Sequence, residues 1–526
     1  MDDGAARGKQ YDRACRTPGG PNAGGLKNNS RTCCACGKTC YHAAGMGNVQ
    51  IRRPVLLLIA CGGLLGGLVL AHVWSRPGWW WAGLLFVVPL LRWRTVRLYV
   101  VVGLLGFGAG WARGGAYQQQ LATYQPLWLR NVTVVAQAAD DSVYGTHSQI
   151  TFGADHVRLA ASAQPLVGSW RVSGFGVSKV FRGDVVAVSG KLYPARGNNQ
   201  ASIGFAQLHV LAHRPGLLDG VRRRFVAGMQ TALPEPLASF GLGLLIGQRS
   251  TLPPDVSQQL LAVGLTHIIA VSGYNLTIMV RAVQRLLGKR SVYQTTATCL
   301  ALIAMFVTIT GSSASIVRAA IVSTLSILAW HVGRTIRPMV LLCFAATLSA
   351  FVNPLYVWGN VSWYLSFLAF FGVLVLAPLA AARVRRGGLL VNVLLESLCA
   401  ELCTMPYVLH IFGQMSLVSL PANLLVAVLV PLAMLLAVVA GLAGMAVPLL
   451  AGWAAWPAVV LLTYMLDMAA VLGRVPHAFV QGVGLSAAGM GTLYTAVGVG
   501  TWTLRRKTAQ KHGIITDRES IQTEGV

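Results

Sequence analysis

Long apolar runs dominate the chain after residue 235, and they most restrict what it can fold into. A helix needs about 20 apolar residues to cross the hydrocarbon core of a bilayer, and several runs approach that length. The 526 residues are 55% hydrophobic and only 11% charged, unlike the usual balance of soluble globular proteins. The sequence therefore predicts a polytopic α-helical membrane protein with about 12 spans.

The expected spans fall into two groups. The first group, in residues 54–114, consists of the runs Pro54–Trp74, Trp79–Leu91 and Leu98–Trp111. The second group lies in residues 236–504, where short helices near 237–247 and 255–270 precede the spans. These later spans are expected near 273–289, 293–310, 313–333, 338–352, 358–380, 389–411, 417–447, 449–473 and 484–504.

Basic residues gather at the ends of these runs and contribute to a net charge of +26. A basic balance can indicate nucleic-acid binding, but the positive-inside rule also concentrates Lys and Arg in cytoplasmic loops. The second explanation suffices for most of the charge. It predicts a protein of the cytoplasmic membrane with both termini in the cytoplasm, including a short tail at residues 505–526.

Residues 1–53 are polar, Gly-rich and basic, which predicts a disordered tail or a start codon read too early. Cys33, Cys34, Cys36, Cys40 and His42 lie close together there. Thiolates and an imidazole can hold zinc, but their spacing fits no standard zinc finger. Zinc stays an alternative at this cluster, and we predict no metal site.

Residues 115–215 have a different texture, with short alternating runs separated by Gly, Asp and Asn. The pattern indicates five or six strands in a small extracytoplasmic β domain, for which an OB-like barrel is expected. Aromatic residues there can stack on bases or fill the barrel core, and the core is the usual role. The candidate outer DNA contacts are Trp170, Phe175, Phe181, Lys179 and Arg182.

Residues 216–235 predict an amphipathic helix in the membrane interface. Leu218, Val221, Phe225 and Met229 form its apolar stripe, beside three consecutive arginines at 222–224.

The stretch GLTHIIAVSGYNL, residues 264–276, is apolar yet contains groups that are awkward inside a bilayer. Ser272 can cap a helix beginning near Gly273, with Asn275 in its first turn. A helix broken in a membrane can direct amide donors at an anion, or its small residues can simply permit close packing. His267, Ser272, Gly273 and Asn275 are therefore candidates for an anion path.

Arg318 follows a second break, in TGSSASIVRA, and an arginine inside a span costs about 2.5–3.5 kcal/mol on insertion scales. It should face the bundle interior, either lining the path of a polyanion or pairing with a carboxylate. The carboxylates considered are Glu396, Glu401 and Asp467. Arg249, which closes another Gly-rich stretch, and Asn423, beside Pro421, complete the candidate path.

We expect neither an enzyme nor a bound cofactor. The sequence contains no G-x-x-x-x-G-K-[ST] phosphate loop and no H-E-x-x-H motif. Ser272 and His267 are the only pair that suggests a nucleophile with its base, and nothing else indicates a hydrolase.

Four ordered blocks resemble the ComEC family of competence proteins. They are GLLIGQRSTLPPDVSQQLLAVGLTHIIAVSGYNLT, SSASIVRAAIVSTLSILAWHVGR, VNPLYVWGNVSWYLSFLAFFG and SLVSLPANLLVAVLVPL. Together they cover much of the membrane region and are more specific than any single motif. The positions that match the family pattern are Gly247, Arg249, Gly264, His267, Ala270, Val271, Ser272, Gly273, Ser315, Arg318, Ala319, Gly333, Arg334, Asn353, Pro354, Leu365, Ser366, Phe367, Ser419, Asn423 and Leu424.

The resemblance implies a channel that imports single-stranded DNA through the cytoplasmic membrane during natural transformation. It also implies partners: an extracytoplasmic DNA receptor and a cytoplasmic translocase or strand-binding protein. Gln248 replaces the usual Asp. No His-x-His-x-Asp-His string of the family's metallo-β-lactamase-like domain occurs, so a separate nuclease is expected if one strand is degraded. Oligomeric state stays open. A secondary transporter of another anionic solute and a non-transporting scaffold are the alternatives.

Overall fold

The computed structural model describes the chain from residue 53 to 523, with gaps. The described ranges are 53–74, 94–144, 149–160, 162, 165–194, 199–213, 217–247, 252–269, 273–287, 291–310, 314–333, 337–384 and 388–523. The N-terminal tail up to residue 52, its Cys-His cluster and the expected span Trp79–Leu91 lie outside these ranges.

The first two described helices, α1 (Arg53–Val73) and α3 (Arg94–Ala122), pack closely along their length. A Cβ atom on Gly67 would overlap the carbonyl oxygen of Phe107, and one on Gly110 would overlap that of Leu64. Small residues let membrane helices approach until their backbones touch. The glycines in these apolar runs therefore determine the α1–α3 contact.

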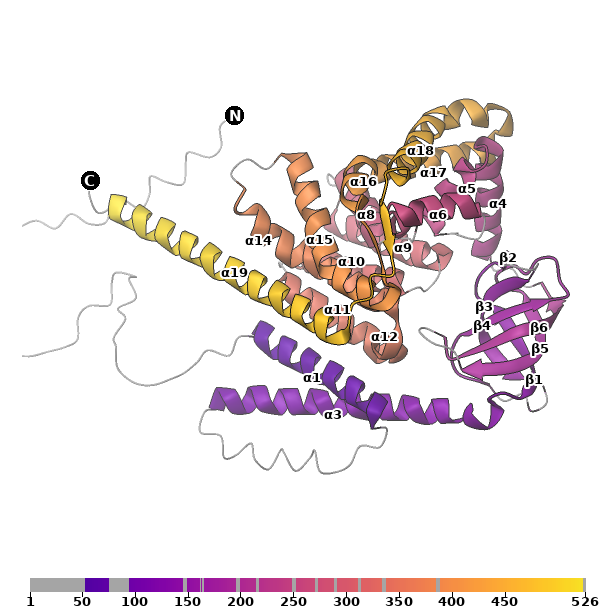
Figure 1. The fold of residues 1–526 in the computed structure, drawn as a ribbon, viewed down its shortest axis with the longest axis horizontal. Coiled ribbons are helices and arrows are strands. Elements are labelled where there is room, and N and C mark those ends of the chain that lie inside the picture. Colours follow the sequence, from indigo (N-terminus) through magenta and orange to yellow (C-terminus); the bar gives the residue numbers. More distant parts are fainter. Residues whose placement is uncertain are drawn as a thin grey trace, which may run out of the picture. The chain divides into compact units, whose positions relative to one another are not determined.

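The remaining helices begin after the β domain (Figure 1). Their positions agree within a few residues with the apolar runs that the sequence marks, except that α19 continues to Thr523 through most of the expected tail at 505–526. They are α4 (Leu217–Ala232), α5 (Leu237–Ile246), α6 (Pro254–Ala262), α7 (Thr266–Ile269), α8 (Gly273–Leu286), α9 (Val292–Thr310), α10 (Ala314–His331), α11 (Pro338–Val352), α12 (Leu355–Gly359), α13 (Val361–Phe371), α14 (Ala377–Ala381), α15 (Leu389–Phe412), α16 (Ser419–Val426), α17 (Val430–Ala446), α18 (Ala451–Gly473) and α19 (Ala487–Thr523).

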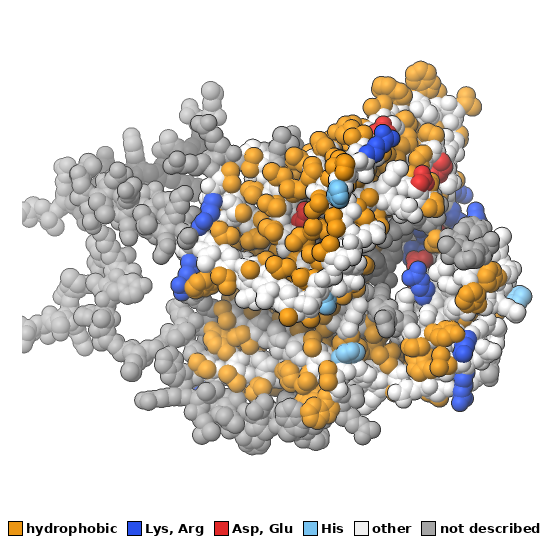
Figure 2. All heavy atoms as spheres, in the orientation of Figure 1, with side chains coloured by type: hydrophobic (Ala, Val, Ile, Leu, Met, Phe, Trp, Pro, Cys, Tyr) orange, Lys and Arg blue, Asp and Glu red, His pale blue; other side chains and the backbone are white. Residues whose placement is uncertain are grey.

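Within the described ranges, 6 helical segments are long and apolar enough to cross a membrane. Shorter apolar helices also occur, for example Pro338–Val352. These findings identify a helical membrane protein but do not support a count of about 12 spans. Figure 2 shows hydrophobic side chains over much of the visible helical surface. The long segments are Pro54–Val73, Val96–Leu127, Val361–Ala381, Val391–Phe412, Ser419–Ala446 and Pro448–Gly473.

The β domain is a small sheet whose strand order is β1-β5-β6-β4-β3-β2. An additional pairing of β1 with β3 closes the sheet into a barrel. The β4–β6 pair is parallel, and the other pairs are antiparallel. The strands are β1 (Asn131–Ala138), β2 (Val143–Tyr144), β3 (Ile150–Leu159), β4 (Trp170–Phe175), β5 (Val185–Pro194) and β6 (Ala201–Ala212).

Helix α4 packs on α17 through glycines. A Cβ atom on Gly444 would overlap the carbonyl oxygen of Gly228, and Phe225 covers Gly441. Met229, part of the apolar stripe expected to face the membrane interface, is fully buried, whereas Val221 is exposed. Part of that stripe therefore packs against protein, because the glycines let α17 come close enough to cover it.

Candidate functional site

A polar site forms where the turn before α7 meets the start of α16. Gly264 adopts a left-handed conformation with φ of +76°, which glycine adopts without steric cost. A Cβ atom at this position would lie 2.8 Å from the Cβ of Ser419 and 3.3 Å from that of Ser416. Only glycine therefore fits both the turn and the contact, which joins two segments about 150 residues apart.

Ser419 links this turn to a carboxylate in the middle of a candidate span. Its side chain is buried, and its hydroxyl contacts Glu401 Oε1 as well as the carbonyl oxygen of Ser416, at 3.1 Å for the latter. Glu401 lies halfway along the apolar segment Val391–Phe412 of α15. The hydroxyl of Ser419 thus holds an intramembrane carboxyl group in place.

Two buried oxygens near this contact have no hydrogen-bond partner in the part of the chain that the structure describes. They are Oγ of Ser416 and Oδ1 of Asn423, which lies one turn after Ser419 on α16. A buried polar atom without a protein partner is costly, so these two oxygens are available to bind a water, an ion or a ligand. We call Gly264, Glu401, Ser416, Ser419 and Asn423 the Glu401 cluster.

The sequence-predicted residues are only partly assembled in this cluster. Asn423 belongs to it. His267 Nδ1 lies 3.0 Å from the carbonyl oxygen of Gly264, with the imidazole exposed. Sequence reasoning considered Glu401 only as a partner for Arg318, and it noted Ser419 only as a matching position. The combination of a mid-span carboxylate with a nearby helix start was the missed signal.

The helix break predicted in the 264–276 stretch falls at residues 270–272, which lie outside the described residues. Helix α7 ends at Ile269 and α8 begins at Gly273, with Asn275 in its first turn. Arg249 and Ser272 lie outside the described residues. The anion path predicted through these residues stays a prediction.

Arg318 is 8% exposed on α10 and faces the bundle interior, as expected. One guanidinium nitrogen, Nη1, donates to the carbonyl oxygen of Ser366. The guanidinium carbon lies 5.9 Å from the ring centroid of Phe367 and 5.1 Å from that of Phe370.

No carboxylate among the described residues forms an ion pair with Arg318. The interpretation that Glu396, Glu401 or Asp467 neutralises it is therefore wrong. Glu401 contacts Ser419 on α16 instead, because the fold directs α15 and α10 to different neighbours at these positions. Arg318 is a buried cation held by a carbonyl group and two aromatic rings.

Three of the five candidate outer contacts already interact with other side chains of this protein. Trp170 is fully buried, and its Nε1 lies 3.4 Å from the hydroxyl of Tyr124. Phe181 lies 4.7 Å beneath the guanidinium of Arg223, and Arg182 Nε lies 3.7 Å from Asp219 Oδ1. Trp170 is therefore a core residue and cannot stack on a base. Lys179 and Phe175 are exposed.

Phe205 is an exposed aromatic residue that sequence reasoning missed. It is 78% exposed, has a φ of +54°, and its ring centroid lies 6.4 Å from that of Phe175. We call this pair the Phe175–Phe205 platform. Phe205 is an extra residue of β6 relative to both β4 and β5. Such a bulge turns a side chain to the other face of a strand, so simple alternation does not reveal it.

The barrel separates its charges. Strands β4, β5 and β6 contain Arg171 and Lys191, both exposed, and no Asp or Glu. Near α4, by contrast, Asp141 Oδ2 lies 3.2 Å from Arg222 Nη2. Burial raises the pKa of Asp155, and the nearby Asp140 carboxylate raises it further.

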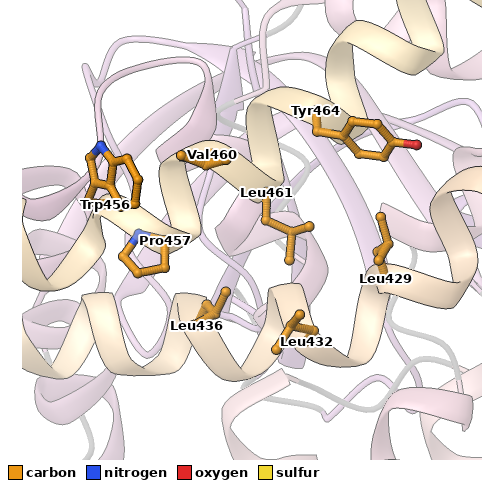
Figure 3. A pocket seen from close by; sticks show the side chains of 8 residues that line it. All are labelled: Leu429, Leu432, Leu436, Trp456, Pro457, Val460, Leu461 and Tyr464. Carbon is orange, nitrogen blue, oxygen red and sulfur yellow. The ribbon is translucent and has the colours of Figure 1, made fainter.

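An apolar groove of about 480 Å³ lies between α17 and α18 (Figure 3). It contains only hydrocarbon and aromatic side chains, apart from the Tyr464 hydroxyl. A polyanion needs cationic or hydrogen-bonding groups, so this groove is no part of a nucleic-acid path. Its lining residues are Leu429, Leu432, Leu436, Trp456, Pro457, Val460, Leu461 and Tyr464.

Within the described ranges, no group of three or more His, Cys, Asp or Glu could hold a metal ion.

Comparison with known proteins places the Glu401 cluster and Arg318 inside a recognised family region. A family model described as "Competence protein" matches residues 244–507. "ComE operon protein 3" of Bacillus subtilis (strain 168) is 24% identical over 207 residues, which are 39% of this chain and 26% of that protein. The chain thus matches about a quarter of this curated relative's length. No solved structure matches the chain.

Proposed function

Because this chain belongs to the competence protein family, whose members take part in DNA uptake, we propose that it is a channel for single-stranded DNA. The observation that carries the proposal is Arg318, a buried cation with no carboxylate partner in the described part of the family region. A single strand carries one negative charge per phosphate, and buried charges need compensation. Arg318 supplies such compensation on the path of the strand.

The rest of the path consists of polar groups at broken helices. The helix break predicted at residues 270–272 directs the start of α8 toward the strand, and Ser416 and Asn423 contribute hydrogen-bonding atoms. Non-helical backbone within a membrane is tolerated where protein or water satisfies it. Each contact is weak, so the strand moves from one to the next.

The barrel receives DNA outside the membrane. Its closed strand order, with one parallel pair between β4 and β6, supports the proposal of an OB-like barrel, a fold that binds single strands. The Phe175–Phe205 platform stacks bases, and Arg171 and Lys191 on the neighbouring strands attract phosphates. This replaces Trp170 and Phe181 as the base-stacking residues.

The protein acts with partners and lies in the cytoplasmic membrane with both termini inside. No phosphate-binding loop for ATP occurs in the sequence, so the chain does not itself hydrolyse ATP through such a loop. A DNA receptor outside and a translocase or strand-binding protein inside complete the system, with a separate nuclease if one strand is degraded.

A clean deletion of the gene tests this function. Cells are given labelled DNA, and label is measured separately in the surface-bound and cytoplasmic fractions. We expect the cytoplasmic label to be lost and the surface-bound label to remain, and the complete gene should restore the cytoplasmic label. Unchanged cytoplasmic label in the deletion strain contradicts the proposal.

A further inference from the structure

Glu401 is a carboxyl group without a cation. It lies at the middle of a candidate span, where an ionised side chain is expensive. No ion pair involves it within the ranges that the structure describes. A carboxylate in this position therefore needs a positive charge that the described residues do not supply, such as a proton or a metal cation.

The surroundings of Glu401 consist of oxygen atoms. Ser419 contacts it through Oγ, and that same hydroxyl contacts the carbonyl oxygen of Ser416. A hydroxyl has one hydrogen, which cannot fully satisfy both oxygens. A proton on Glu401 that is donated to Ser419 resolves this shortage, and so does a cation shared between the carboxylate and the hydroxyl.

The partnerless oxygens supply the second argument. Oγ of Ser416 and Oδ1 of Asn423 are buried beside or one turn from Ser419. Carboxylate, hydroxyl, amide and carbonyl oxygens suit hard cations such as Na⁺. Broken helices place such oxygens within membranes, where transporters bind H⁺ or Na⁺. Here α15 ends at Phe412 and α16 begins at Ser419, with the short strand β7 (Gln414–Ser416) between them.

We infer that the Glu401 cluster is a binding site for a monovalent coupling cation, either a proton or Na⁺. The biological role of the site rests on the proposed function, since downhill movement of this cation would drive the import of DNA. The binding site itself is independent of whether the transported solute is DNA.

In the part of the chain that the structure describes, the groups that face this site come from the elements packed around it. Ser419 comes from α16, Ser416 from β7, and Gly264, with His267 bonded to it, from the turn before α7. On α15, Cys403 instead contacts α19, where Tyr494 donates to its carbonyl oxygen. Of these groups, histidine is the residue type that ordinarily titrates near neutral pH, so His267 needs its own control.

Thermal unfolding of the purified full-length protein in detergent tests the site. Na⁺ replaces choline at constant ionic strength, and pH is varied separately. A ligand that binds only the folded state raises Tm, and we expect a rise of about 2 °C or more for the wild type. If the cation is Na⁺, Tm rises with Na⁺. If it is a proton, Tm rises as pH falls, because the folded state then binds more protons than the unfolded state.

Glu401→Gln should abolish this response, since it preserves the shape of the side chain and removes its charge. Glu396→Gln is the matched control, because Glu396 is exposed on the same helix and points about 140° away. His267→Gln should also keep the response. If Glu401→Gln does not fold, Ser419→Ala should weaken the response while leaving the carboxyl group. No response in the wild type, or an equal response in Glu401→Gln, overturns the site.

DNA import measured in parallel separates the two proposals. Cation binding without any import of labelled DNA overturns the channel function and leaves the site intact. Import at the wild-type rate in Glu401→Gln, with cation binding lost, overturns the coupling role and leaves the channel function intact.

Discussion

The barrel and the membrane helices bury charge in opposite ways. In the barrel, Asp184 is fully buried, yet it accepts the backbone N–H of Phe181 at 2.9 Å and pairs with His213 at 3.0 Å. In the helices, Arg318 is buried against a carbonyl group and two aromatic rings, without a described carboxylate. Asp184 is thus held by groups of its own domain, whereas Arg318 is a buried cation without a described anion, and a buried charge left without a counter-charge is costly.

The two surfaces differ in the same sense. The barrel exposes an aromatic pair, and its strands β4 and β5 expose Arg171 and Lys191, which suits a nucleic acid in water. The helices expose large hydrophobic side chains such as Leu449 and Trp453, which suits lipid. Contact with a polyanion inside the membrane region must therefore occur in its interior.

Replacing Arg318 should have the largest effect. Arg318→Ala removes the buried cation, and a hydrogen bond to a charged group is worth about 1.5–3 kcal/mol. Transformation should therefore fall about 100-fold, with the protein still in the membrane fraction. Arg281→Ala on the exposed side of α8 is the control. Normal transformation in Arg318→Ala would mean that Arg318 stabilises the fold and does not contact DNA.

Removing the Phe175–Phe205 platform should have an intermediate effect. Stacking on one aromatic side chain is worth about 1–3 kcal/mol per base, so Phe205→Ala should weaken oligonucleotide binding about 10-fold. Fluorescence anisotropy with the full-length protein and a single-stranded probe measures this. Leu211→Ala, which removes another exposed side chain of β6, should bind normally. Equal affinities for both variants would remove the platform from the DNA interface.

The ion pair between Asp141 and Arg222 should have a smaller effect, because partial exposure screens it. Asp141→Arg and Arg222→Asp should each lower the stability of the full-length protein, and the double charge reversal should restore part of it. The expected coupling is about 1 kcal/mol or less, decreasing with salt, and Tm in a double-mutant cycle measures it. Additive losses would show that the barrel does not use this pair to neutralise charge.

Asp155→Asn should have the smallest effect. Burial first, and then Asp140, raises the pKa of Asp155 above its usual 3.8. The folded state therefore holds this proton more tightly than the unfolded state, so wild-type stability rises as pH falls through the raised pKa toward 3.8. The Asn variant should lack this rise in stability at low pH. At neutral pH its free energy of unfolding should exceed that of the wild type by less than about 1 kcal/mol.

Urea titrations from neutral to acidic pH measure this difference. Asp255→Asn changes an exposed carboxylate in the first turn of α6 and should keep the wild-type pH profile. An unchanged profile in Asp155→Asn would mean that the barrel does not bury this charge at a cost.

The local pattern of the chain was a good guide to its elements. The apolar runs predicted helices near Val292–Thr310 and Pro338–Val352, where α9 and α11 lie. The number of spans was less predictable. Helices such as Pro338–Val352 are apolar but short, and hydrophobicity alone does not tell whether a short helix crosses a membrane or packs inside a bundle.

The composition and order of apolar runs by themselves determined a helical membrane protein with a β domain, because burial of apolar surface and backbone hydrogen bonding depend on local periodicity. Only the tertiary structure decided which polar groups meet. Glu401 and Ser419 come together through the contact of Gly264 with α16, and a bulge exposes Phe205. Such meetings depend on backbone approaches between distant segments, and periodicity within one segment does not encode them.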